Sequence, residues 1–134
     1  MSAKSYWDDP AQTVIRIDYE GNWTWEEYFA AADDGRDLAS SVTHRVDYIL
    51  DFRNGTQPKA GSVMSNARNV LLKRAPNSGV FVTVSTPFAQ VMLNVFKSFD
   101  RKLSALIYGA TSIEEAHAIL AKVRQQEAER TPQT

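Results

Sequence analysis

The stretch VDYILDFRNG at residues 46–55 decides the fold class of this 134-residue chain. Its first part, Val46 to Phe52, predicts a strand, and Asn54-Gly55 is a typical turn sequence that ends it. Further along, VFVTV at residues 80–84 predicts a buried central strand, because only Thr83 interrupts its apolar run. An apolar pattern of helical period lies between the two strands. Strand, helix and strand in this order predict parallel strands joined by a right-handed crossover.

Strands are also predicted on either side of this unit. Residues 13–21 alternate apolar with polar or charged side chains, which predicts a strand with one buried face and one face in water. Ser5-Tyr6-Trp7 predicts an extra strand before it. SALIY at residues 104–108 predicts a last strand, which Gly109 is expected to end.

The chain is therefore expected to be one α/β domain over residues 1–134. Its four-stranded, mainly parallel sheet of βα units carries the extra N-terminal strand within residues 1–12. A polar tail is expected at residues 126–134.

Two helix starts carry capping signals. Thr24 and Glu27 have the spacing of a capping box, and Trp23 can pack on Tyr28 as a hydrophobic staple. Gly35 lies inside the same helix and predicts a bend or a break, since glycine costs about 1 kcal/mol in a helix interior. For the last helix two capping boxes stay open, Thr111 with Glu114 and Ser112 with Glu115.

Composition excludes several classes of function. The formal net charge of −1 gives no field that would attract a nucleic acid or an anionic membrane. Without cysteine there are no disulfides and no zinc–thiolate sites, and with only two histidines neither a metal nor a cofactor is expected. No apolar run approaches the roughly 18 residues of a membrane span, and the first ten residues have no signal-peptide core. The expected location is the cytoplasm.

Three phrases of the sequence resemble a known family. VDYILDFRNG (46–55), GVFVTVSTPFAQ (79–90) and YGATSIEEAHAIL (108–120), in this order of elements, resemble STAS-like domains, the family of the anti-sigma-factor antagonists, which includes stand-alone bacterial members. The resemblance extends from about Thr13 to Ala121. It implies a four-stranded βα superhelix that acts through protein–protein contact. Some members of the family are switched by phosphorylation or by a small ligand.

Ser62 lies near the position at which phosphorylatable members of that family carry an Asp-Ser-Ser-Gly-like phrase. Residues 56–62 read TQPKAGS here, which departs from that phrase. Ser62 is therefore either a phosphoacceptor or the N-cap of a helix, a role worth about 1 kcal/mol. We favour the N-cap.

The ends of two predicted strands offer a candidate ligand site. Asp51, Arg53 and Asn54 lie at the end of one strand, and Ser85 and Thr86 lie at the matching end of the next. Ligands of open α/β sheets bind at the carboxyl ends of the strands. The alternative interpretation is turn chemistry, because Asn54 precedes a glycine and Thr86 precedes a proline.

A predicted helix that ends at about Phe99 offers the candidate protein interface. Its apolar residues cover an arc of roughly 200°, whereas the usual stripe is somewhat over 100° wide. Either neighbouring helices cover the flanks of this arc or a partner does. Leu93 and Phe96 are the predicted contact residues, for a protein partner or for a second copy of the chain.

Basic residues gather around the ends of the second and third predicted helices, Lys73 and Arg74 among them. They are interpreted either as complements of the helix dipole or as a patch for an acidic partner. The first interpretation is the simpler one.

No catalytic constellation is recognisable in the sequence. There is no phosphate-binding Gly-rich loop and no Gly-x-Ser-x-Gly elbow, and neither His44 nor His117 has an evident partner. A response-regulator receiver is disfavoured, because Glu20 is the single acid at the end of the strand predicted at residues 13–21. The sequence therefore predicts a non-enzymatic STAS-like module that binds a protein. The alternative is a module that binds a small ligand, a nucleotide or a lipid, at the strand ends.

Overall fold

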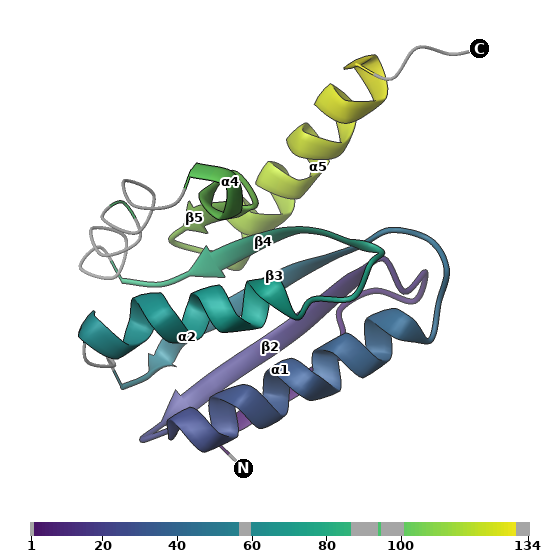
Figure 1. Ribbon diagram of the computed structural model, residues 1–134. Coiled ribbons are helices and arrows are strands. Elements are labelled where there is room, and N and C mark those ends of the chain that lie inside the picture. The colour runs from purple at the N-terminus through teal and green to yellow at the C-terminus, as the bar shows by residue number, and fades with distance from the viewer. Residues whose placement is uncertain (1, 57–59, 87–93, 95–100, 131–134) are drawn as a thin grey trace.

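The computed structural model describes residues 2–56, 60–86, 94 and 101–130. In this part of the chain five strands form one sheet in the order β1-β2-β3-β4-β5 (Figure 1). The strands are β1 (Ala3–Trp7), β2 (Val14–Gly21), β3 (Val46–Gly55), β4 (Ser78–Val84) and β5 (Ile107–Ala110). The helices among these residues are α1 (Trp25–Ser40), α2 (Ala60–Leu72), α4 (Arg101–Ser104) and α5 (Ile113–Arg130).

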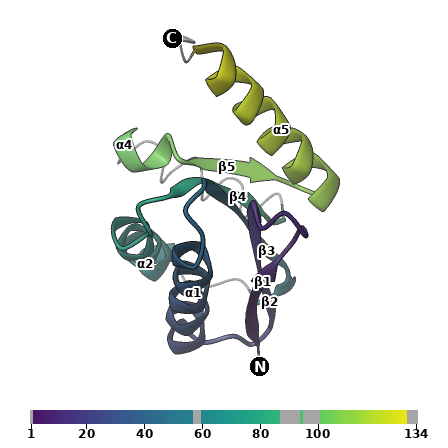
Figure 2. The same cartoon turned by 90° about the vertical axis from the view of Figure 1, so that its right-hand side faces the viewer.

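The sheet is mainly parallel, as the sequence predicts. β1 runs antiparallel to β2, while β2, β3, β4 and β5 are parallel to one another. Each parallel strand joins the sheet beside the one before it, so right-handed crossovers place α1 and α2 on the same face. α5 lies on the opposite face, where it packs against β3, β4 and β5 (Figure 2). The α/β class and the extra N-terminal strand are thereby confirmed.

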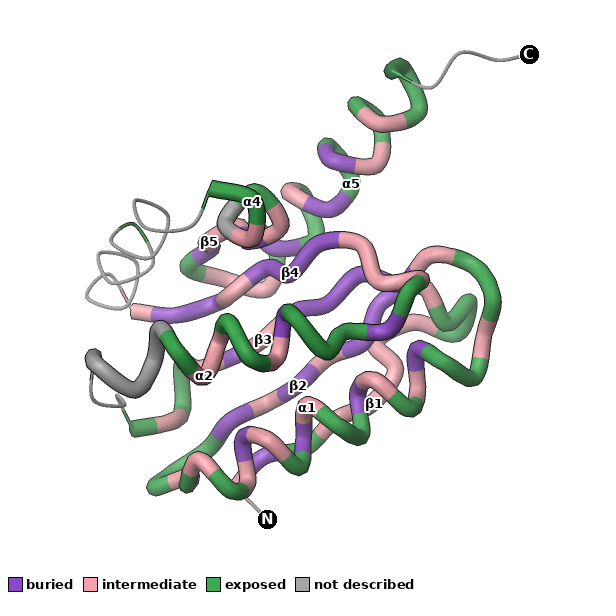
Figure 3. Tube along the Cα trace, viewed as in Figure 1, coloured by how far each residue is buried: buried purple, intermediate pink, exposed green. Residues whose placement is uncertain are grey.

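The core has two halves, one on each face of the sheet. Ile15 and Ile17 of β2 belong to the half beneath α1 and α2, and Ile49 and Val82 belong to the half beneath α5. Figure 3 shows buried positions along the central strands, whereas the helices alternate between buried and exposed positions. Burying one such aliphatic side chain is worth about 1.5–3 kcal/mol, so the two apolar layers hold the helices on the sheet.

Both predicted helix caps form. The Thr24 hydroxyl accepts a hydrogen bond from the Glu27 N–H at 3.1 Å, and the Glu27 carboxylate accepts one from the Thr24 N–H at 3.0 Å. The rings of Trp23 and Tyr28 lie 5.8 Å apart, centroid to centroid, which confirms the staple. At α5 the Ser112 hydroxyl accepts from the Glu115 N–H at 3.0 Å. The pair that caps this helix is therefore Ser112 with Glu115, and not Thr111 with Glu114.

The predicted bend at Gly35 is wrong, because α1 runs without interruption from Trp25 to Ser40. Gly35 is buried against the sheet, and a Cβ at this position would lie 3.4 Å from Ile17 Cδ1 and 3.8 Å from Ile15 Cγ2. These are ordinary van der Waals distances, so the available space does not require a glycine; the packing of α1 on β2 outweighs its poor helix propensity.

Three strand boundaries differ from the prediction. β3 continues through Asn54 and Gly55, which pair with Glu20 and Gly21 beyond an irregularity in the pairing where β3 has one extra residue. β5 begins at Ile107, because residues 101–104 form the short helix α4. Gly109 does not end β5, since it pairs with Thr83 inside the sheet. At Gly55 and Gly109 pairing with the neighbouring strand outweighs the local turn preference, which the local sequence cannot reveal.

The polar C-terminal segment is helical as far as Arg130, where α5 ends. An ion pair between Arg45 and Glu127 ties this part of the helix to the start of β3. None of the helices among the described residues combines the length and the apolar character that crossing a bilayer requires.

A fully buried carboxylate, Asp47 of β3, connects the sheet to α5. Its Oδ1 accepts from the Val80 N–H at 2.8 Å and from Arg45 Nε at 3.1 Å, and its Oδ2 accepts from Arg124 Nε at 2.8 Å. Arg124 also donates to the Thr13 carbonyl at 3.0 Å. Because a Cβ at Gly79 would collide with the Asp47 carboxylate, a glycine is required there.

We expect Asp47→Asn to lower the free energy of unfolding by about 2–4 kcal/mol, since it removes the charge that compensates two arginines. Asp33→Asn is the matched control. Asp33 is exposed on α1 and pairs with Arg36 there, so its loss should change stability by less than about 0.5 kcal/mol. Urea unfolding followed by circular dichroism measures both changes, and equal losses would contradict the role of Asp47.

Candidate functional site

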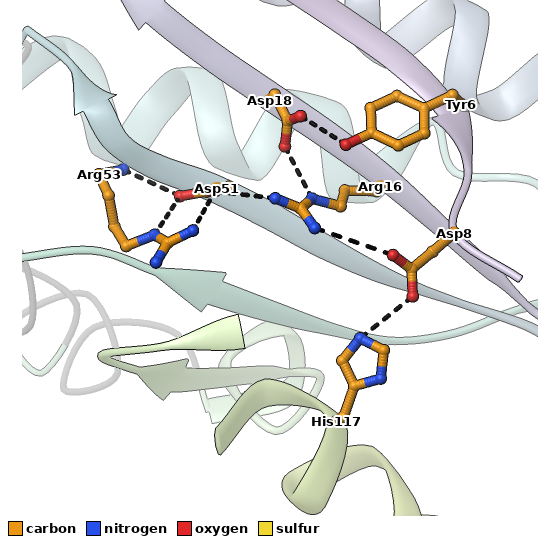
Figure 4. A network of polar contacts seen from close by, with 7 residues as sticks. All are labelled: Tyr6, Asp8, Arg16, Asp18, Asp51, Arg53 and His117. Atoms are coloured by element: carbon orange, nitrogen blue, oxygen red, sulfur yellow. Dashed lines mark hydrogen bonds and ion pairs between the residues drawn. The ribbon is translucent and has the colours of Figure 1, made fainter. Parts of the chain in front are cut away.

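Six side chains form a connected polar network on the α5 side of β1, β2 and β3, shown in Figure 4. We call it the polar sheet face and define it by Tyr6, Asp8, Arg16, Asp18, Asp51 and Arg53. Arg16 and Asp18 project from β2 away from α1, because they alternate with the buried residues Ile15, Ile17 and Tyr19. The part of this sheet face that α5 does not cover therefore carries polar side chains.

Arg16 lies at the centre of the polar sheet face. Its Nε donates to Asp18 Oδ1 at 2.9 Å, and its Nη2 donates to Asp51 Oδ2 at 3.2 Å. The Tyr6 hydroxyl donates to the other oxygen of Asp18 at 2.5 Å. Asp18 and Asp51 are register partners on β2 and β3, so the sheet itself sets the spacing of the two carboxylates.

Asp51 and Arg53, both predicted for the ligand site, contact each other directly. Arg53 Nε donates to Asp51 Oδ1 at 3.0 Å, and Arg53 Nη2 donates to Asp51 Oδ2 at 2.9 Å. This is a bidentate pair, and the Arg53 N–H adds a third hydrogen bond to the same carboxylate at 3.1 Å. The Asp51 side chain is 5% exposed and that of Arg53 is 39% exposed.

The pKa values of these groups follow from the pairing. Burial alone would raise the pKa of Asp51, but the hydrogen bonds from Arg53 outweigh it and hold this pKa below its ordinary value. The hydrogen bond to Asp51 also raises the pKa of Arg53. Burial, together with the hydrogen bond to Asp18, raises the pKa of Tyr6 to about 12. Asp51 and Arg53 therefore stay charged and Tyr6 stays neutral around neutral pH. The hydrogen bonds among them do not change with pH in this range.

The structure gives His117 a partner that the sequence does not reveal. His117 Nε2 lies 3.1 Å from Asp8 Oδ2, and Asp8 is also 3.9 Å from Arg16. Asp8 follows β1 and His117 lies on α5, so only the packing of α5 across the sheet brings them together. His44 lies elsewhere, with its Nε2 2.7 Å from the Gln12 carbonyl oxygen.

The other three residues of the predicted strand-end site lie at or beyond the ends of β3 and β4. Asn54 is exposed near the end of β3. Ser85 is buried, and its N–H donates to the Ala110 carbonyl at 3.1 Å. Thr86 is half-buried after β4. Of the five predicted residues, only Asp51 and Arg53 are brought into contact by the hydrogen bonds given above.

Ser62 is the third residue of α2 and therefore not the N-cap, which corrects that interpretation. Leu93 and Phe96, the predicted contact residues, lie outside the described residues and stay a prediction. Among the described residues there is no cluster of three or more His, Cys, Asp or Glu side chains that could hold a metal ion.

A pocket of about 150 Å³ opens between α1 and α2, on the opposite face of the sheet. Its lining combines aliphatic and aromatic residues of β2, β3 and β4 with Tyr28, Phe29 and Ala32 of α1 and Val70 of α2. Asp33, Arg36, Asn69, Lys73 and Arg74 complete the lining. Sequence reasoning missed this pocket, because the spacing of α1 and α2 depends on how each helix packs on the sheet.

Comparison of the chain with models of known protein families and with curated proteins gave no match. The site is therefore interpreted from its own geometry.

We expect Asp51→Asn to lower the free energy of unfolding by about 1.5–3 kcal/mol near pH 6, the range for hydrogen bonds to charged groups. The pKa of Asp51 is lower in the folded chain than in the unfolded chain. Its charge therefore stabilises the fold above the unfolded value of about 3.9, and this contribution is lost as the pH falls through the folded value. The difference in the free energy of unfolding between wild type and variant should become smaller below about pH 4.

Urea unfolding of both proteins near pH 6 and near pH 2.5 measures this difference. Asp37→Asn, at an exposed position of α1, should unfold like the wild type near pH 6. A difference for Asp51→Asn that has the same size at both pH values would contradict the pairing of Asp51.

Proposed function

We propose that this chain is a STAS-like, non-enzymatic module that binds an acidic segment of a protein partner at the polar sheet face. The order of its elements supports the STAS-like part of this proposal. An N-terminal strand precedes βα units whose strands join the sheet one beside the next. Action by protein contact is what the resemblance to that family implies.

One observation carries the choice of partner. The acids of the polar sheet face are largely buried, as is Arg16 at 21% exposed, whereas Arg53 at its edge is exposed. The side chains of Asp8, Asp18 and Asp51 are 12%, 22% and 5% exposed, against 39% for Arg53. Lys4, next to Tyr6 on β1, is exposed as well. Arg53 and Lys4 are thus the exposed cations here, Glu20 of β2 is an exposed acid on the same side, and the two cations favour a carboxylate-bearing partner.

The arrangement of the network also suits recognition. Arg53 is held by a bidentate pair to Asp51, and Arg16 is held between Asp18 and Asp51. A fixed guanidinium loses less side-chain entropy on binding than a free one, so more of the interaction energy is left for affinity. Tyrosine and arginine are also enriched at protein interfaces and among the residues that dominate binding energy. The strands β1 to β3 thus present interface residues on a rigid support.

Selection of acidic peptides from a displayed library on the wild-type protein tests the proposal. NMR titration with a selected peptide should shift backbone signals of β1, β2 and β3. We expect Arg53→Gln to weaken this peptide about tenfold, because a charged contact is lost. Lys4→Glu should weaken it similarly, and Lys4 makes no ion pair among the described residues whose loss could unfold the chain.

Lys122→Glu is the matched control, since Lys122 is exposed on α5 outside the polar sheet face. It should leave the affinity within about twofold of the wild type. The proposal fails if selected peptides shift signals elsewhere, or if Lys122→Glu weakens them as much as Lys4→Glu does.

A further inference from the structure

We infer that the pocket between α1 and α2 binds a small molecule that carries one aromatic ring and a carboxylate. This site lies on the opposite face of the sheet from the polar sheet face, so the inference does not rest on the proposed protein contact. Its support comes from the size of the pocket, from the rings that line it and from the charges at its edge.

The size of the pocket sets the size of the ligand. Its volume is about 150 Å³. Apolar cavities of roughly this volume in proteins hold a molecule of the size of benzene. A nucleotide or a long-chain lipid is several times larger, so only a part of such a molecule would fit within this volume. A single ring fits it.

The lining favours an aromatic ring. Tyr19, Tyr28, Phe29, Tyr48 and Phe81 all line the pocket. Tyr48 and Phe81 form a stacked pair with centroids 4.3 Å apart, and Tyr19 and Tyr28 form another at 5.6 Å. A ligand ring can extend these arrangements by stacked or edge-to-face contacts, which are worth more than apolar contact area alone. Ile17 and Leu50 add aliphatic contacts from β2 and β3.

The charges in the lining favour a carboxylate. Arg36, Lys73 and Arg74 are its cations and Asp33 is its single acid. Asp33 already pairs with Arg36 at 3.1 Å, and Arg74 Nη1 donates to the Leu71 carbonyl at 2.6 Å. The Lys73 ammonium makes no hydrogen bond or ion pair with the described residues. It is therefore the group that is left to bind an anionic ligand, with Arg36 and Arg74 nearby.

Phenylacetate is the probe that tests the inference. In an NMR titration it should shift signals of Ile17, Leu50 and Val70, with a dissociation constant of about 1 mM or lower. Phenylacetamide has the same shape without the charge and should bind about three- to tenfold more weakly. Lys73→Gln should weaken phenylacetate by the same factor and leave phenylacetamide unchanged, which a merely structural effect would not do.

A variant that fills the pocket completes the test. Ala32 lines the pocket from α1, so Ala32→Leu should weaken phenylacetate at least about tenfold. Ala30→Leu places the same side chain at an exposed position of the same helix and should have no effect. Neither variant should change the binding of an acidic peptide to the polar sheet face, so failures of the two proposals can be told apart. The inference is overturned if phenylacetamide binds as tightly as phenylacetate, if Ala32→Leu binds normally, or if about 10 mM phenylacetate shifts no signal of the pocket.

Discussion

The pairing of two buried carboxylates on β3 with arginines is the interaction on which the rest of the structure depends. Asp47 and Asp51 project from the same face of the strand, and Ile49 lies between them. Each carboxylate is held by two arginines, Asp47 by Arg45 and Arg124 and Asp51 by Arg16 and Arg53. A buried carboxylate without such partners costs several kcal/mol, so these arginines must stay in place for the sheet to form.

The two carboxylates have different consequences because α5 covers only one of them. At Asp47, α5 contributes Arg124. Because the Asp47 carboxylate also accepts from the Val80 N–H of β4, it holds α5 across β3 and β4. At Asp51 both arginines come from the sheet, so the network extends over β2 and β1 and leaves Arg53 partly exposed. The same kind of ion pair attaches α5 to the sheet at Asp47 and leaves one arginine, Arg53, partly exposed at Asp51. The pocket between α1 and α2 is independent of both, since it lies on the other face.

Features that depend on neighbours in the chain could be predicted from the sequence, and those that depend on packing could not. The alternation at residues 13–21 and the capping box of Thr24 and Glu27 are local, and both form as expected. Gly35 and Gly109 were misread because a helix-to-sheet contact and a strand pairing outweigh their local preferences. Asp51 and Arg53 share one strand, so the sequence brings them close, whereas the contacts of Asp8 with His117 and of Asp47 with Arg124 join residues far apart in the sequence.

The proposed binding at the polar sheet face requires that Asp51 hold Arg16 and Arg53 rigidly. The most direct measurement is ¹⁵N relaxation of the Nε–Hε groups of Arg16 and Arg53, which reports motion on the picosecond to nanosecond timescale. The account predicts order parameters close to the value of about 0.85 found for rigid backbone. Values below about 0.6 would show guanidinium groups that move freely in solution, and would contradict it.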